Sequence, residues 1–165
     1  MSDWNEFFAL RRVACFALAL LLLPLGAAKA AEPQGEWLVA DKNARIRIAD
    51  CAGAMWGVVS WETDPGVDAK NPDPSKRTRP TLGMPVLLGM KPDGKDRWSG
   101  RIYNSENGKF YSGGIAMLAD DRLRVRGCIL GFLCGGENWT RFRPEAGAAA
   151  LEPEETLCLR LHETR

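Results

Sequence analysis

The chain has 165 residues, of which 45% are hydrophobic and 26% are charged, with 22 Lys and Arg against 21 Asp and Glu. This length suits about one domain, and the nearly balanced charge argues against a nucleic-acid-binding protein. The only histidine, His162, lies near the C-terminus, which argues against histidine-based catalysis and against zinc sites built from several histidines. We therefore expect no metal and no cofactor.

The N-terminal segment, residues 1–30, has the pattern of a signal peptide. Arg11 and Arg12 precede an apolar run over residues 13–25, and Ala28-Lys29-Ala30 has the form of a cleavage site. The apolar run is too short for a stable transmembrane helix. We therefore expect a periplasmic protein with no membrane span after cleavage, comprising a β domain over residues 31–143 and an acidic tail over residues 144–165.

The body of the chain alternates in short segments separated by turn residues, which is typical of an all-β domain. Asn107-Gly108 is a favourable hairpin dipeptide because both residues tolerate positive φ. Eight strands joined by hairpins predict an antiparallel up-and-down barrel or a sandwich. One apolar segment, residues 84–90, is either a buried strand or a short helix. The expected strands span residues 35–40, 44–50, 54–61, 84–90, 97–104, 109–118, 122–129 and 137–143.

The two ends of the body favour the barrel. Gly35-Glu36-Trp37 opens the first expected strand, and Trp139-Thr140-Arg141 closes the last. An indole at the narrow end of a barrel offers a π-face on which a guanidinium can stack. This arrangement is similar to that of the calycins and lipocalins, so Gly35, Trp37, Trp139 and Arg141 are expected to be structural.

Alternation also predicts which side chains face the core. Ile46 and Ile48 alternate with arginines, as do Leu123 and Val125. The ordinary pattern places the apolar side chains inside and the arginines in solvent. The alternative places Arg126 at the mouth of the barrel, facing an anionic ligand.

The connection over residues 62–80 is unusually long for a compact domain and contains four prolines. Asn71 and Asp73 are turn-forming residues, and Arg77 and Arg79 would point to one side of an extended chain. The segment is either a lid over the barrel mouth or a rigid cover. In the second case its arginines pair with its own aspartates, Asp64, Asp68 and Asp73.

Removal of the signal peptide would leave four cysteines, an even number that favours disulfides in an oxidising compartment. We expect a Cys128–Cys134 bond, because the glycine-rich chain there can bend. Cys51 and Cys158 either pair or remain free. The tail is expected to be loosely attached, with one short helix.

Several motifs occur in the order found in one bacterial family, the domain-of-unknown-function family numbered 2147, which the chain resembles over about residues 35–143. They include Gly35-x-Trp37, Asp50-Cys51-x-Gly53, the segment 71–80 and Trp139-Thr140-Arg141. The resemblance implies an exported protein with a calycin-like barrel and no established activity. Family members often carry a second cysteine five residues after the first. Trp56 stands there in this chain, which makes Cys158 a candidate partner for Cys51.

The expected function is binding of a small hydrophobic, amphipathic or anionic ligand inside the barrel. The alternative is a protein-interaction or inhibitor module that uses the segment 62–80, with no partner identified. Catalysis is least favoured because the body lacks histidine, which leaves Tyr103 near Glu106 as the one acid–base pairing. The candidate ligand contacts are Trp56, Trp61, Arg77, Arg79, Tyr103, Tyr111 and Arg126.

Overall fold

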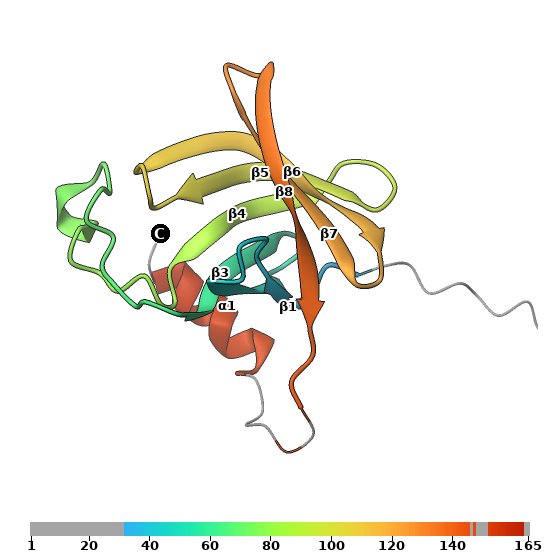
Figure 1. The fold of residues 1–165 in the computed structure, drawn as a ribbon, viewed down its shortest axis with the longest axis horizontal. Coiled ribbons are helices and arrows are strands. Elements are labelled where there is room, and N and C mark those ends of the chain that lie inside the picture. Colours follow the sequence, from blue (N-terminus) through green and yellow to red (C-terminus); the bar gives the residue numbers. More distant parts are fainter. Residues whose placement is uncertain (1–31, 146, 148–151, 164–165) are drawn as a thin grey trace, which may run out of the picture.

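The structure is a computed structural model that describes residues 32–145, 147 and 152–163. The expected signal peptide lies outside these residues. Eight antiparallel strands each pair with the next along the chain, and the last pairs with the first, so the sheet closes into an up-and-down barrel (Figure 1). The barrel is therefore confirmed and the sandwich is excluded. The strands are β1 Gly35–Leu38, β2 Ala44–Asp50, β3 Met55–Glu62, β4 Pro85–Pro92, β5 Arg97–Asn104, β6 Lys109–Ala119, β7 Arg122–Ile129 and β8 Leu133–Phe142.

Most strand bounds agree with the expected ones, and the apolar segment 84–90 forms most of β4 rather than a helix. The main difference is β8, which begins at Leu133, four residues earlier than expected. Glycines usually weaken strands, so Gly135 and Gly136 concealed this start. A Cβ at residue 136 would lie 2.3 Å from the carbonyl oxygen of Val125, so glycine is what allows the two strands to pair here.

The barrel core consists of the inward-facing side chains of all eight strands. Ile46, Ile48, Leu123 and Val125 are buried among them, whereas the alternating arginines lie on the outer face. Arg126 is exposed on that outer face and does not lie at the cavity mouth. Burial of the aliphatic and aromatic side chains supplies the main driving force for folding.

Trp37 and Arg141 close one end of the barrel. The indole of Trp37 is fully buried and donates a hydrogen bond to the carbonyl oxygen of Pro33 at 2.7 Å. The guanidinium of Arg141 lies 4.2 Å from the centre of the indole ring and donates to the carbonyl oxygens of Glu32, Gln34 and Asp120. Burial lowers the pKa of Arg141, and the neighbouring charge of Arg143 adds to this effect.

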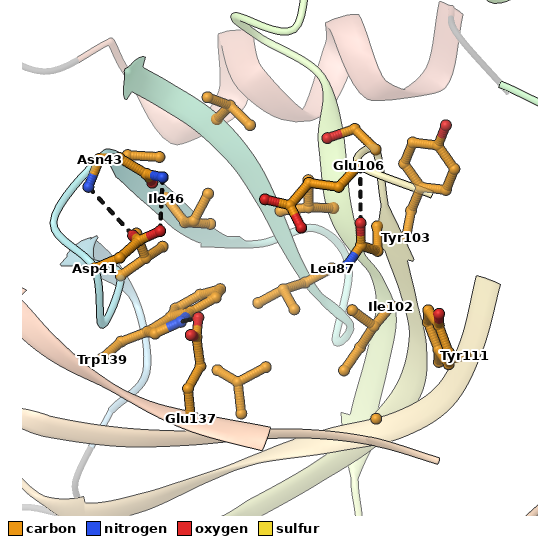
Figure 2. A pocket seen from close by; sticks show the side chains of 18 of the residues that line it. Asp41, Asn43, Ile46, Leu87, Ile102, Tyr103, Glu106, Tyr111, Glu137 and Trp139 are labelled. Carbon is orange, nitrogen blue, oxygen red and sulfur yellow. Dashed lines mark hydrogen bonds between the residues drawn. The ribbon is translucent and has the colours of Figure 1, made fainter. Parts of the chain in front are cut away.

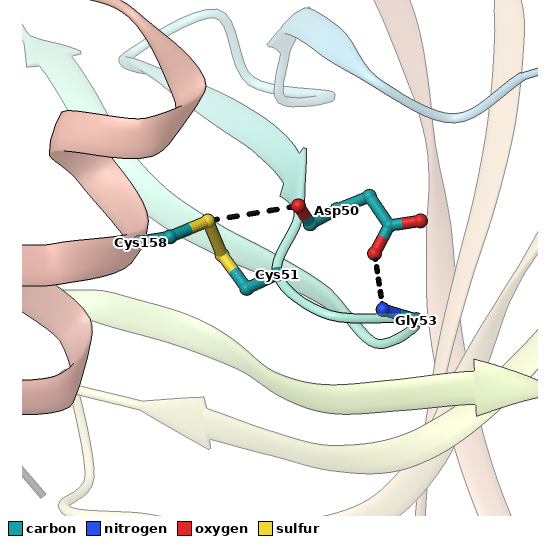
Figure 3. The surroundings of a disulfide bond; sticks show 4 residues. All are labelled: Asp50, Cys51, Gly53 and Cys158. Carbon is teal, nitrogen blue, oxygen red and sulfur yellow. Dashed lines mark hydrogen bonds between the residues drawn. A yellow bond between two sulfur atoms is a disulfide. The ribbon is translucent and has the colours of Figure 1, made fainter.

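The C-terminal tail is attached to the barrel rather than loose, which corrects the expectation. Helix α1, Glu154–Glu163, packs on the outside of the barrel and buries Leu157 and Leu161 against β2 and β3. A Cys51–Cys158 disulfide joins it to the end of β2 (Figure 3), with the two Cα atoms 5.5 Å apart. The signal of this packing in the sequence is the i, i+4 spacing of Leu157 and Leu161 within α1.

The second disulfide joins Cys128 to Cys134, as expected. These residues are direct partners across the β7–β8 hairpin, where their Cα atoms lie 4.0 Å apart. The chain reverses at residues 130–132 rather than at the glycines 135 and 136.

Candidate functional site

A cavity of about 880 Å³ occupies the end of the barrel opposite the closure by Trp37 and Arg141. Its walls are formed by inward-facing residues of β2 to β8, and its mouth by the β1–β2, β3–β4 and β5–β6 connections; Figure 2 labels Asp41, Asn43 and Glu106 there. Most of the wall is aliphatic or aromatic. The wall includes Ile46, Val59, Met84, Leu87, Ile102, Tyr111, Val125 and Trp139.

The mouth of the cavity is acidic. Five carboxylates are among the lining residues, and no lysine, arginine or histidine is among them. Glu137 reaches into the cavity from β8, and its carboxylate accepts a hydrogen bond from the indole nitrogen of Trp139 (Figure 2). Such a rim attracts a positively charged group and repels a negatively charged one. The five carboxylates belong to Asp41, Glu62, Asp64, Glu106 and Glu137.

The connection between β3 and β4 is a rigid cover held together around one buried carboxylate. The side chain of Asp68 is fully buried, and one of its oxygens accepts hydrogen bonds from Arg79 and from the amide of Asn71. Its other oxygen accepts a hydrogen bond of 2.6 Å from the hydroxyl of Tyr103. Burial, followed by this hydrogen bond, raises the pKa of Tyr103 to about 12.

The rest of this cover is fixed by local contacts. Arg77 donates to the carbonyl oxygen of Asn71, so this arginine is turned toward its own segment. Asp73 caps the short 3₁₀ helix η1, Pro74–Lys76, by accepting a hydrogen bond from the backbone of Ser75. The hydrogen bonds from Ser75 lower the pKa of Asp73. The interpretation of this segment as a self-paired cover therefore holds for Arg79 and Asp68.

The cover also contacts the β5–β6 turn at the cavity mouth. The ammonium of Lys70 donates a hydrogen bond of 2.6 Å to the carbonyl oxygen of Glu106. The backbone of Lys70 passes so close to Gly108 that a Cβ at that position would lie 1.9 Å from its carbonyl oxygen. The cover therefore supports the β5–β6 turn on one side of the cavity mouth.

The structure brings together only part of the predicted site. Tyr103 and Tyr111 line the cavity, as does Trp139, which we expected to be structural. The other five candidates lie elsewhere, and we no longer propose them as contacts of a ligand in this cavity. Trp56 packs beside α1, Trp61 lies on the outside under the guanidinium of Arg45, Arg77 and Arg79 belong to the cover, and Arg126 is on the outer face.

The acidic rim was missed by sequence reasoning. Glu137 could have been found, because it lies two residues before Trp139 within the expected strand 137–143 and alternation places the two side chains on one face. The remaining rim carboxylates lie at strand ends or in turns, where side-chain direction follows no period. No group of three or more His, Cys, Asp or Glu side chains within the described ranges is placed to hold a metal ion.

Comparison with known families matches residues 35–141 to DUF2147, described as an uncharacterized protein conserved in bacteria. The chain belongs to this family. The match to DUF2147 begins at Gly35 and ends at Arg141, so the closed end of the barrel belongs to the shared region, whereas α1 and Cys158 lie beyond it. A search of curated proteins found no match.

Among solved structures, the chain is similar to protein HP1028 from the human pathogen Helicobacter pylori, described as belonging to the lipocalin family. The TM-score is 0.67 at 19% sequence identity, and the match covers 77% of this chain and 97% of HP1028. At this identity the likeness establishes a shared lipocalin-like fold. The described residues of this DUF2147 protein contain no helix that is long and apolar enough to cross a membrane.

Proposed function

We propose that this protein is an exported carrier or sensor of a small amphipathic molecule, which holds its apolar part inside the barrel and a neutral or positively charged end at the rim. The observation that carries this proposal is the cavity, with apolar walls and five carboxylates at its mouth. Its volume of about 880 Å³ falls in the range of pockets that enclose drug-sized ligands. A lipocalin-like fold is compatible with such a role.

The charge of the rim specifies the ligand more closely than the fold does. A carboxylate or phosphate placed there would face Glu137 and Glu106 with no cation among the lining residues to offset the repulsion. An ammonium group would be attracted by the same carboxylates. We therefore set aside the anionic ligand considered from the sequence and favour a neutral or cationic amphiphile.

Export is supported by two independent observations. The N-terminal 30 residues have the composition of a signal peptide, and the four cysteines of the remaining chain form two disulfides. Disulfides persist in oxidising compartments such as the bacterial periplasm.

Binding is a better proposal than catalysis because the one acid–base pairing considered is not formed. The hydroxyl of Tyr103 donates to Asp68 rather than to Glu106. Its raised pKa keeps that hydroxyl protonated near neutral pH, which makes it a poor general base. The only histidine, His162, is on α1 outside the barrel.

Displacement of a neutral fluorescent probe, N-phenyl-1-naphthylamine, tests the proposal. The competitors are a twelve-carbon amine, alcohol and carboxylate, which share one apolar chain and differ in the charge of the end group. We expect the amine and the alcohol to displace the probe at lower concentrations than the carboxylate. Failure of all three to compete, or strongest competition by the carboxylate, would contradict the proposal.

The role of the rim is tested by the double variant Glu106→Gln/Glu137→Gln, which removes two charges and keeps side-chain size. We expect affinity for the amine to fall by roughly tenfold while affinity for the alcohol is retained, since each partly exposed charge pair contributes up to about 1 kcal/mol. The matched control is Asp93→Asn/Glu155→Gln, two exposed carboxylates that do not line the cavity. An equal effect of both double variants would show that the rim does not select the ligand.

A further inference from the structure

The turn of the β7–β8 hairpin presents large apolar side chains to solvent. We call residues 129–133, Ile-Leu-Gly-Phe-Leu, the apolar tip. The exposed fractions are 50% for Ile129, 80% for Leu130, 73% for Phe132 and 61% for Leu133. The Cys128–Cys134 disulfide closes the base of the tip and limits the conformations available to it. Apolar side chains concentrated in this way on a soluble domain usually mark a binding surface.

The apolar tip projects beyond the end of the neighbouring strand β1. On one side, β8 pairs with β1 no farther toward the tip than Thr140, which follows Leu133 by seven residues. A strand rises about 3.3 Å per residue, so the tip extends roughly 20 Å past that edge. On the other side, β6 pairs with β7 only as far as Cys128. Figure 1 shows the hairpin standing clear of the other strands.

The outer face of the same strands is basic. In the register of the sheet, Arg97 and Arg124 flank Ala116, and Arg126 lies between Gly114 and Gly136, so small residues separate the arginines. Alternation places Arg101 and Arg122 on this face as well. Within the described residues of β5 to β8, Glu137 is the one acidic residue, and its side chain points into the cavity. No Asp or Glu therefore lies on the outer face of these strands. We call the five arginines the basic face.

We propose that the apolar tip inserts into the surface of a lipid bilayer that contains anionic phospholipids, while the basic face lies against their headgroups. Apolar side chains next to a cluster of Arg or Lys form the combination by which peripheral proteins bind such membranes. A membrane fits better than a protein partner, because five residues at a convex tip offer far less than the roughly 1,200 Å² buried in stable protein interfaces. This inference does not depend on the identity of the cavity ligand.

Part of the acidic rim lies away from the tip. Asp41 follows β1, the strand beyond whose end the hairpin projects. Ile129 and Leu133 belong both to the tip and to the cavity lining. An apolar path therefore runs from the inserted tip into the cavity, so a bilayer-dissolved amphiphile could enter without crossing water.

Vesicle sedimentation tests the proposal, with vesicles of phosphatidylcholine alone and of phosphatidylcholine mixed with phosphatidylglycerol. We expect the disulfide-bonded protein to bind the mixed vesicles and to release them as salt is raised. The variant Leu130→Ser/Phe132→Ser is expected to bind roughly a hundredfold more weakly, since each buried apolar side chain contributes about 1.5 kcal/mol or more. These two residues do not line the cavity, so probe binding there is expected to remain.

Two matched controls separate the tip and the basic face from general effects. Leu82→Ser/Leu159→Ser changes two exposed leucines away from the tip and the basic face, and Lys42→Gln/Arg143→Gln removes two exposed charges away from the basic face. Both are expected to bind mixed vesicles like the unchanged protein, whereas Arg124→Gln/Arg126→Gln is expected to bind less tightly. Absence of binding to mixed vesicles, or binding unaffected by the tip variant, would overturn the proposal; the first result would leave a protein as the partner of the tip.

Discussion

The hydroxyl of Tyr103 on β5 donates a hydrogen bond of 2.6 Å to the buried carboxylate of Asp68 in the β3–β4 connection, 35 residues earlier in the chain. The same carboxylate accepts hydrogen bonds from Arg79 and Asn71. A buried charge is tolerated when it is paired and fully hydrogen-bonded in this way. Asp68 is therefore the residue on which the shape of the cover depends.

Replacement of this carboxylate is expected to destabilise the protein. Asp68→Asn removes the charge that faces Arg79 and disturbs the hydrogen bonds around it. We expect a loss of about 2–3 kcal/mol in the free energy of unfolding, because Arg79 is left partly buried without its partner. Urea denaturation measures this loss. Asp64→Asn, an exposed aspartate in the same connection, is the control and is expected to change stability little.

The raised pKa of Tyr103 predicts a loss of stability at high pH. The phenol ionises near pH 10 when unfolded and near pH 12 when folded, so its contribution is fully present below pH 10 and is lost as pH rises toward 12. We expect Tm to fall across this interval and to fall less in Tyr103→Phe. An ultraviolet titration of phenolate absorbance should show a step near pH 12 that the variant lacks; a complete titration of both tyrosines by pH 11 would contradict this account.

The two disulfides are expected to stabilise the protein to different degrees. The Cys51–Cys158 bond spans 107 residues and the Cys128–Cys134 bond spans 6. Chain-entropy arguments give about 5 kcal/mol for the long loop and about 2 kcal/mol for the short one. Cys51→Ser/Cys158→Ser should therefore lower the free energy of unfolding more than Cys128→Ser/Cys134→Ser does. The reverse order would show that contacts of α1 with the barrel contribute little to stability.

The closed end of the barrel is expected to require arginine specifically. Arg141 donates to three carbonyl oxygens and stacks on Trp37, and an ammonium cannot reproduce that planar geometry. We expect Arg141→Lys to lower the free energy of unfolding by about 2 kcal/mol, since several hydrogen bonds of a charged donor are lost. Thermal unfolding followed by circular dichroism measures the effect. Arg143→Lys, an exposed neighbour, should leave Tm within error.

The effect on stability of the contact between the cover and the β5–β6 turn can be measured by comparing substitutions at two glycines. Gly108 and Gly53 both have positive φ, but only the first has a neighbour within 4 Å, the backbone of Lys70. Alanine adds backbone strain at either position, which costs about 1 kcal/mol. Gly108→Ala should therefore cost about 1–2 kcal/mol more than Gly53→Ala, because the added methyl group pushes the cover away. If both variants lose the same free energy of unfolding in urea denaturation, the cover does not restrain the β5–β6 turn.

The barrel could be predicted from the sequence because alternation, hairpin turns and the Trp37–Arg141 pair all indicate it. The cavity contacts could not be predicted in the same way. Trp56 and Trp61 have the residue type of ligand contacts, but the packing of α1 beside Trp56 and the bulge in the β2–β3 register next to Trp61 decide where they lie. The start of β8 was hidden because Gly135 and Gly136 resembled a turn, although the opposing backbone of Val125 requires the second of them.

The two disulfides also imply an order of events during folding. Cys128 and Cys134 become neighbours as soon as one hairpin forms, so their bond can close while the rest of the chain is still unfolded. Cys51 and Cys158 meet only when α1 has docked on β2 and β3, across a separation of 107 residues, so we expect their bond to form after the hairpin bond. An oxidant that acts before the hairpin forms could join Cys51 to Cys128 or Cys134, which is a non-native pairing. Rapid closure of the hairpin bond removes those partners and leaves the correct pair.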